Sequence, residues 1–144
     1  MKELIQKFRS CFAPRKMHKV LIIDDSRIDT MLAVKALDGV YHVRTAECGR
    51  VGLELAAAEN PDIILLDYMM PDLNGPQTCC LLKEDPRTRD IPVIFLTGMD
   101  APRNFVNALE QGAESYIVKP FDGRELREEI AMRIRPCVVN GKER

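Results

Sequence analysis

The sequence contains no tryptophan, few other aromatic residues and no marked excess of charge of either sign. A formal net charge of -1 gives no broad attraction to a polyanion, so nucleic acid is not expected as a partner. No apolar run approaches the roughly 20 residues that a membrane-spanning helix requires. What remains is a globular composition, with 46% hydrophobic and 30% charged residues, in a chain of 144 residues that has the size of one ordinary domain.

The cysteines and histidines show neither a disulfide pattern nor a metal-ligand pattern. The five cysteines form no CxxC pair, and an odd number in a chain without a recognisable signal peptide argues against a disulfide framework. A cytoplasmic location is therefore expected. Cys79 and Cys80 are expected to be ordinary helix thiols, and His18 and His42 lie in no ligand spacing with other His, Cys or acidic residues.

From Lys19 onward, short apolar runs rich in β-branched residues alternate with segments of helical periodicity. Five such units predict an α/β fold with an open, doubly wound parallel sheet that is covered by helices on both faces. The expected strands are Val20–Ile23, His42–Thr45, Ile63–Leu66, Val93–Leu96 and Tyr116–Val118.

Two of the expected helices have a clear apolar stripe. The first is expected after Asp25, where Ser26 and Asp29 have the spacing of a capping box. The last is expected to end before Pro136. The predicted stripes are Ile28, Leu32 and Ala36 in the first helix and Leu126, Ile130 and Ile134 in the last.

Charged or reactive residues stand where the predicted strands end, namely Asp24, Asp25, Asp67, Thr97 and Lys119. Because parallel strands share one direction, these residues are expected to converge at one edge of the sheet. Three neighbouring carboxylates repel one another and imply a divalent cation. Ligands that are all oxygen favour Mg²⁺, with Mn²⁺ as an alternative.

Asp67 is the expected nucleophile, because a carboxylate that accepts a phosphoryl group forms an acyl phosphate. Asp24 and Asp25 would then hold the metal with Asp67, while Lys119 and Thr97 would contact the phosphoryl oxygens. Taken singly, each residue has an ordinary alternative as a helix cap, a loop acid, a turn residue or a solvated charge. Their occurrence together at successive strand ends favours the phosphoryl site.

Four separated motifs, in this order, resemble those of the receiver domain of bacterial two-component response regulators. The resemblance covers residues 17–135 and implies a flavodoxin-like (βα)5 sandwich with a five-stranded parallel sheet in the order 2-1-3-4-5. Residues 1–16 then form an N-terminal extension and residues 136–144 a short polar tail. The motifs are the acidic pair Asp24–Asp25, the phosphoacceptor segment Leu65–Gly75, the switch segment Phe95–Gly98 and the lysine motif Lys119–Phe121.

The resemblance implies further roles at positions that match the family. The backbone carbonyl of Met69 is expected to complete the metal site, and the peptide bond between Lys119 and Pro120 is expected to be cis. Thr97 and Tyr116 are the expected switch pair, whose movement remodels the face formed by the fourth helix, fifth strand and fifth helix. Tyr116 has an ordinary alternative as a strand aromatic with its hydroxyl at the surface.

Met69 and Met99 flank the expected phosphoryl group, at positions where the family often has polar or acidic side chains. These positions tend to govern the attack of water on the phosphoryl group. We hypothesise that the two apolar side chains hinder that water and lengthen the lifetime of the phosphoryl group. The alternative is that both are ordinary loop methionines without a kinetic effect.

The expected function is that of a single-domain response regulator in a two-component system or phosphorelay, since the chain is short for a receiver plus an output domain. A sensor histidine kinase or a histidine phosphotransfer protein is the expected phosphoryl donor, and an unidentified protein is the expected target. The chain would be a phosphoacceptor switch and not an enzyme, catalysing only its own phosphotransfer and slow autodephosphorylation. We expect a monomer or a weak phosphorylation-dependent dimer.

Three alternatives stay open. The chain could act as a phosphoryl shuttle within a multistep phosphorelay, or as a degenerate receiver that only binds a partner. A degenerate receiver usually lacks an active-site residue, and none is missing here. It could also be a haloacid-dehalogenase-like phosphatase, because those enzymes use a nucleophilic Asp, a Ser or Thr, a Lys and an acidic pair. That family begins with Asp-x-Asp and places the acidic pair last, whereas here Asp24 and Asp25 precede Asp67.

The N-terminal extension has the pattern of a short amphipathic basic helix. Such a helix could contact an anionic membrane surface, a partner or a second copy of the chain. The alternative is a helix docked on its own domain or a frayed terminus. The apolar face, which is too interrupted for a signal-peptide core, holds Leu4, Ile5, Phe8, Cys11 and Phe12, and the positive charges are Lys2, Lys7, Arg9, Arg15 and Lys16.

Overall fold

The computed structural model describes residues 17–98, 102–134, 138–139 and 142–143. The strands of the main sheet are β1 (Lys19–Ile23), β2 (His42–Ala46), β3 (Ile63–Asp67), β4 (Val93–Thr97) and β5 (Ser115–Val118). The helices are α2 (Arg27–Leu37), α3 (Gly49–Glu59), α4 (Gly75–Glu84), α5 (Pro102–Glu110) and α6 (Gly123–Arg133). The five strands are parallel and lie in the order β2-β1-β3-β4-β5, which confirms the predicted order.

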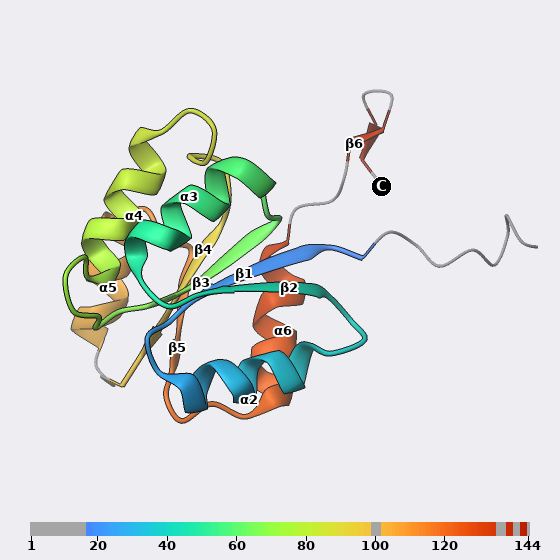
Figure 1. Ribbon diagram of the computed structural model, residues 1–144, viewed down its shortest axis with the longest axis horizontal. Helices are drawn as coiled ribbons and strands as arrows, with labels where there is room; N and C mark the ends of the chain where they lie inside the picture. The colour runs from blue at the N-terminus through green and yellow to red at the C-terminus, as the bar shows by residue number, and fades with distance from the viewer. Residues whose placement is uncertain (1–16, 99–101, 135–137, 140–141, 144) are drawn as a thin grey trace, which may run out of the picture.

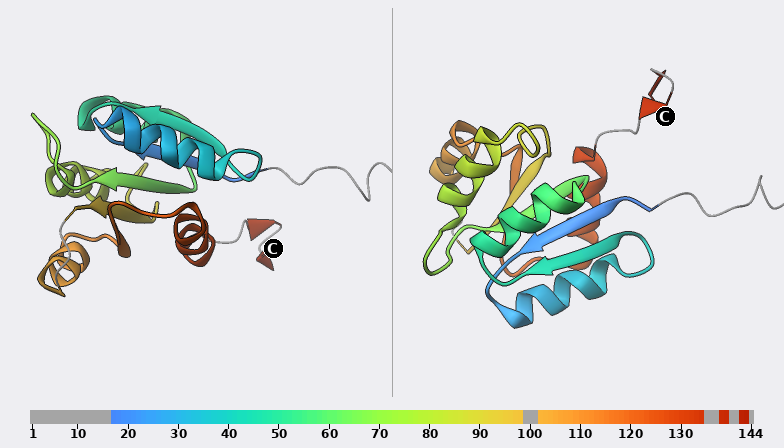
Figure 2. Two further views of the ribbon diagram at one scale, coloured as in Figure 1. Left: turned by 90° about the horizontal axis from the view of Figure 1, so that it is seen from below. Right: turned by 45° about the horizontal axis from the view of Figure 1, so that its top comes forward.

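The sheet lies between two layers of helices, with α2 and α6 on one face and α3, α4 and α5 on the other (Figure 1). Alternate side chains of β1 point to opposite layers: Leu21 and Ile23 join the cluster under α3, α4 and α5, and Val20 and Ile22 join the cluster under α2 and α6. The central strands β3 and β4 are buried along their whole length, whereas β2 lies at an edge and is partly exposed. Figure 2 shows the same layers from two further directions.

The helix α2 buries a different face from the one predicted. Its buried residues are Ala33 and Leu37, whereas Ile28 and Leu32 of the predicted stripe are 72% and 51% exposed, and Ala36 is only partly buried. The predicted stripe was therefore wrong. Because α2 is apolar around most of its circumference, two stripes have helical spacing, and the one with the small Ala33 allows the closer approach to the sheet.

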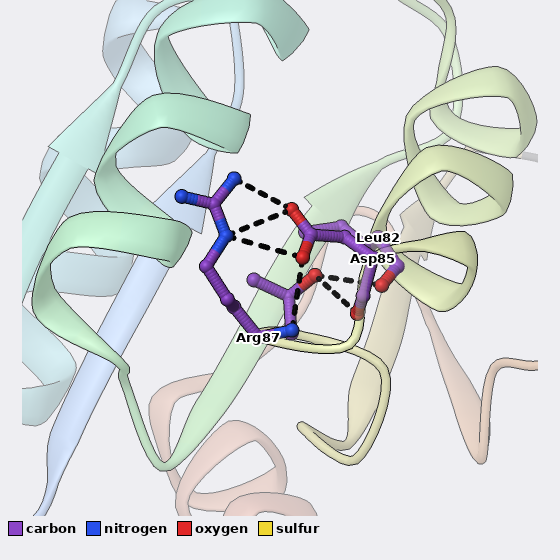
Figure 3. A network of polar contacts seen from close by, with 4 residues as sticks. Leu82, Asp85 and Arg87 are labelled. Atoms are coloured by element: carbon purple, nitrogen blue, oxygen red, sulfur yellow. Dashed lines mark hydrogen bonds and ion pairs between the residues drawn. The ribbon is translucent and has the colours of Figure 1, made fainter.

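Polar contacts close the C-terminal end of α4 (Figure 3). The Thr88 hydroxyl donates a hydrogen bond of 2.7 Å to the carbonyl oxygen of Leu82. The Arg87 guanidinium lies 2.8 Å from the carboxylate of Asp85, the residue that caps this end of the helix. The Thr88 bond satisfies one helix-terminal carbonyl group, at the end of α4 that is far from the carboxyl ends of the strands.

The last two helices differ in how far they bury their apolar residues. Leu126 and Ile130 of α6 are buried and Ile134 packs against the same cluster, which confirms the predicted stripe. On α5, by contrast, Val106 and Leu109 are 51% and 45% exposed. An apolar part of α5 therefore faces away from the core.

Past α6, the strands β6 (Val138–Val139) and β7 (Lys142–Glu143) pair in an antiparallel arrangement, in a segment for which the sequence predicted only a polar tail. Residues 1–16, with the predicted basic helix, and Met99 lie outside the described residues. Within the described part of the chain, no helix has the length and apolar character needed to cross a membrane.

Candidate functional site

Polar residues of four strands meet at the edge where these parallel strands end. Asp24 and Asp25 follow β1, Asp67 and Thr97 are the last residues of β3 and β4, and Lys119 follows β5. One carboxylate oxygen from each of Asp24, Asp25 and Asp67 lies within 4.8 Å of the other two. Asp24 and Asp67 are buried, at 2% and 6% exposure, whereas Asp25 is exposed. The structure thus brings together the three acids that the sequence places at strand ends.

The Lys119 ammonium reaches into this group of acids. Its Nζ atom lies 2.9 Å from Asp24 Oδ2 and 3.3 Å from Asp67 Oδ1. The peptide bond between Lys119 and Pro120 is cis. The backbone N–H of Lys119 donates a hydrogen bond of 2.7 Å to the carbonyl oxygen of Thr97, which ties the loop after β5 to the end of β4.

Asp29 is a further member of the site that the sequence analysis did not assign to it. The pattern predicted a capping box, but only one half forms: the Ser26 hydroxyl accepts a hydrogen bond of 3.3 Å from the backbone N–H of Asp29. The Asp29 carboxylate instead lies 2.9 Å from Lys119 Nζ. Its place in the sequence could have indicated this role. Asp29 lies in the first turn of the helix that follows β1, and that turn starts at the same edge of the sheet as the other acids.

The charges of the site do not balance. Burial, together with a hydrogen bond and the negative charge of Asp24, raises the pKa of Asp67 from 3.8 to about 7, although the Lys119 ammonium opposes this. Burial would lower the pKa of Lys119, but hydrogen bonds to Asp24 and Asp29 outweigh it, so that this pKa is raised. The Lys119 ammonium thus faces three carboxylates, those of Asp24, Asp29 and Asp67.

These residues fit a hard divalent cation. The three clustered carboxylates offer only oxygen ligands, and a bound cation would stabilise the ionised form of Asp67, which burial and the charge of Asp24 disfavour by raising its pKa. Oxygen ligands and a partly open site suit Mg²⁺, which keeps several waters and accepts phosphate oxygens. The metal ligation predicted for the backbone carbonyl of Met69 stays a prediction. The Met69 side chain is 67% exposed.

The start of α4 packs directly behind Asp67. A reciprocal capping box fixes this start: Asn74 Oδ1 accepts from the Gln77 N–H at 2.9 Å, and Gln77 Oε1 accepts from the Asn74 N–H at 3.0 Å. The helix then approaches so closely that a Cβ atom on Gly75 would lie 2.5 Å from the carbonyl oxygen of Asp67. Glycine at this position therefore lets α4 support the strand end that carries Asp67.

A pocket of about 250 Å³ opens beside the acidic pair. The apolar side chain of Met31, on α2, lines the pocket, and this residue is 71% exposed. Its wall combines the end of β1, the first turn of α2 and the end of β2, through Asp24, Asp25, Arg27, Thr30, Met31, Thr45, Ala46 and Glu47.

The expected switch residues lie on adjacent strands. Thr97 is buried at the end of β4. Tyr116 lies on β5, is partly buried, and pairs in register with Phe95 of β4 while packing against the core cluster under α5. This placement is compatible with a switch, and the switch itself stays a prediction.

The fold places the chain among the flavodoxin-like α/β domains. The model of the response regulator receiver domain matches residues 20–131, and the chain belongs to this family. Domains of this family are phosphoacceptor switches that bind Mg²⁺ at an acidic pocket, and they interact with histidine kinases or phosphotransfer proteins. The match does not support the phosphatase alternative, which belongs to another family.

Individual relatives agree with this assignment. Response regulator PleD of Caulobacter vibrioides is 41% identical over 105 residues, which are 72% of this chain and 23% of that protein. The DNA-binding dual master transcriptional regulator RpaA of Synechocystis is 35% identical over 120 residues, which are 83% of this chain and 50% of that protein. The chain thus spans half or less of the length of these curated relatives.

Solved structures show the same fold over nearly their full length. The chemotaxis response regulator CheY4 of Vibrio cholerae superposes with a TM-score of 0.78 at 28% identity, covering 83% of this chain and 100% of that chain. The N-terminal domain of a response regulator receiver protein from Methanoculleus marisnigri gives a TM-score of 0.68 at 36% identity, covering 81% of this chain and 96% of that chain.

Proposed function

We propose that this receiver domain is a Mg²⁺-dependent switch of a two-component system or phosphorelay that is phosphorylated on Asp67. The observation that carries the proposal is the setting of the Asp67 carboxylate, which lies within 4.8 Å of oxygens of Asp24 and Asp25 and 3.3 Å from the Lys119 ammonium. The proposed nucleophile, the carboxylates that can bind a cation and the Lys119 ammonium are thus adjacent at one edge of the sheet.

In the proposed reaction, an oxygen of Asp67 attacks the phosphorus of a phosphohistidine on the donor protein. The new O–P bond forms as the P–N bond breaks, and the imidazole nitrogen leaves with the electron pair and takes a proton. Lys119 donates hydrogen bonds to the transferring oxygens, and Thr97 supplies a hydroxyl donor. Mg²⁺, held by Asp24, Asp25 and Asp67, would neutralise the charge on the phosphoryl oxygens.

The surroundings of the site support contact with a donor protein. Ile28 and Met31 of α2 are 72% and 71% exposed, and Met31 lines the pocket beside Asp24. An apolar surface next to the nucleophile allows a partner to dock while its phosphohistidine reaches Asp67. We therefore infer that the kinase or phosphotransfer protein contacts α2.

The output is proposed to leave through the face of α5, β5 and α6, which is the face that the family resemblance assigns to the switch. Val106 and Leu109 expose apolar surface on α5, and Tyr116 lies on the neighbouring strand. Movement of Thr97 toward the phosphoryl group and of Tyr116 inward would change this face and its affinity for a downstream protein. A phosphoryl shuttle would use the same site. Docking of a downstream protein and phosphoryl transfer to another protein therefore both start from phosphorylated Asp67 and differ only in the partner.

Intact-mass measurement after incubation with acetyl phosphate and Mg²⁺ tests the proposal. We expect one added phosphoryl group in the wild type, none in Asp67→Asn and little in Asp25→Asn, because that variant lacks a metal ligand. Asp38→Asn removes one exposed carboxylate at the far end of α2 and should be phosphorylated like the wild type. No adduct in the wild type, or an adduct that survives Asp67→Asn, would contradict the assignment.

A further inference from the structure

Three carboxylates share the Lys119 ammonium. Its Nζ atom lies 2.9 Å from Asp24 Oδ2, 2.9 Å from Asp29 Oδ2 and 3.3 Å from Asp67 Oδ1. The contacts to Asp24 and Asp67 are hydrogen bonds, and the contact to Asp29 is an ion pair. The contact to Asp29 is as short as the contact to Asp24 and shorter than the contact to the nucleophile.

Asp29 differs from the other two acids in what else it can bind. Asp24 and Asp67 belong to the group whose oxygens lie within 4.8 Å of one another, together with Asp25, and Asp29 is not a member of that group. A cation bound by the group would compete with Lys119 for the carboxylate oxygens of Asp24 and Asp67. The contacts of these two residues with the ammonium would then weaken. The ion pair between Asp29 and Lys119 would remain.

The position of Asp29 is fixed by its own helix. Its backbone N–H is bonded to the hydroxyl of the capping residue Ser26, and its carboxylate lies in the first turn of α2, where the helix dipole favours negative charge. The cap uses the backbone of Asp29 and leaves the carboxylate for Lys119. A change confined to the side chain therefore spares the cap.

We propose that Asp29 is a positioning residue that holds Lys119 toward α2 in the resting site and competes with the phosphoryl oxygens for its ammonium. The proposal rests on the function proposed above, in which Lys119 donates to those oxygens. A phosphoryl group on Asp67 must draw Lys119 away from Asp29 or share it with Asp29. The carboxylate of Asp29 thus opposes phosphorylation.

Beryllofluoride, a non-covalent substitute for the phosphoryl group, tests this competition at saturating Mg²⁺. Tyrosine fluorescence can follow the titration, because the chain has three tyrosines and no tryptophan. Asp29→Asn replaces the ion pair with Lys119 by a weaker neutral contact, so we expect the variant to bind beryllofluoride about 3- to 10-fold more tightly. Asp29→Glu retains the charge and should return the affinity toward that of the wild type.

A separate Mg²⁺ titration distinguishes positioning from metal ligation. Asp29→Asn should change the affinity for Mg²⁺ by less than about threefold, whereas loss of a direct ligand in Asp25→Asn should weaken it by about tenfold or more. Asp38→Asn, which removes the same charge from the other end of α2, should leave both affinities unchanged. Thermal unfolding of each variant shows that the fold is retained.

The outcomes separate this inference from the proposed function. If the wild type binds beryllofluoride but Asp29→Asn binds it equally or more weakly, the competition does not exist and only this inference fails. A large loss of Mg²⁺ affinity in Asp29→Asn would make Asp29 a metal ligand and would also overturn it. If the wild type neither binds beryllofluoride nor becomes phosphorylated on Asp67, both proposals fail.

Discussion

At the scale of single residues, the site depends on acids that lie close together although like charges repel one another. Asp24 and Asp67 are buried, and their oxygens lie near those of the exposed Asp25. Lys119, which follows the edge strand β5, offsets part of this charge. An acyl phosphate forms in such a site only when positive charge is already in place, and this is the condition that a cation and Lys119 meet together.

The lifetime of the phosphoryl group is the property that we expect Met69 and Met99 to control. Replacing them by polar or acidic residues, in Met69→Asn and Met99→Glu, should admit and orient the attacking water. Loss of the phosphoryl group should then be faster by roughly tenfold, a change of about 1.4 kcal/mol in the barrier. The decay of the phosphorylated protein, followed by intact mass after removal of the donor, measures this rate.

Met132→Asn is the matched control for this measurement. Met132 is 71% exposed on α6, near the end of that helix, and should not affect the decay. Equal decay rates in the wild type and in both site variants would sink the idea that the methionines exclude water.

The strand-end residues could be predicted because strand direction alone places them. Asp24, Asp67 and Lys119 each stand at the end of an apolar run, and parallel strands bring such ends to one edge. The role of Asp29 could not be predicted in this way. A Ser26 cap and an acid three residues later fit either a capping box or a contact with the site, and only the direction of the side chain decides between them.

At the scale of elements, the site depends on how closely α4 approaches β3. A Cβ atom on Gly75 would lie 2.5 Å from the carbonyl oxygen of Asp67 and 2.7 Å from the Cα atom of Tyr68. Both atoms belong to the backbone and cannot turn aside as a side chain could. The helix must therefore move away if any other residue stands at this position.

We expect Gly75→Ala to lower the free energy of unfolding by about 1 to 3 kcal/mol, because the added methyl group overpacks the junction between α4 and β3. Gly98→Ala is the matched control, since a Cβ atom at Gly98 would meet nothing within 4 Å. Its effect should stay within about 0.5 kcal/mol. Urea unfolding of both variants makes the comparison. Equal stabilities would show that α4 can shift away from β3 at little cost in free energy.

The face that a helix buries was predictable for α6 and not for α2. In α6 the apolar residues are few, so Leu126, Ile130 and Ile134 form one stripe. In α2 the apolar residues surround the helix, and periodicity does not choose between the stripe with Leu32 and the stripe with Ala33. The choice is made by packing against the sheet and α6, which a local pattern does not contain.

At the scale of the whole molecule, the acidic site should cost stability when no cation is bound. The pKa of Asp67 in the folded protein, about 7, lies above its ordinary value of 3.8. Between these two values the folded chain keeps a proton that the unfolded chain has lost. Stability therefore falls as the pH rises through this window, and the loss is complete above about pH 7.

We expect Asp67→Asn to be more stable than the wild type at about pH 8 in the presence of a chelator, by about 2 kcal/mol once solvent screening is allowed for. The difference should shrink as the pH falls and vanish below the ordinary pKa of 3.8, where the wild-type carboxyl is protonated in both states. Urea unfolding across this pH range measures it, with Asp38→Asn as the control. A difference that stayed constant with pH would show that the ionisation of Asp67 is not its cause.

Whole-molecule architecture was the most predictable level. Alternating apolar runs and helical segments predicted the doubly wound sheet, and the family motifs implied the strand order that the structure has. The pairing of β6 with β7 was not predicted, because two strands of two residues each carry too little pattern to be recognised.

The position of Lys119 at the end of the last strand of the main sheet has a consequence for biosynthesis. Lys119 contacts Asp24, a residue 95 positions earlier, and in the sheet β3 and β4 lie between their strands. The proposed phosphoryl site is therefore complete only after β5 has emerged from the ribosome and joined the sheet. A nascent or truncated chain has the acids but not the lysine, so competence to receive a signal reports that the domain has been made and assembled in full.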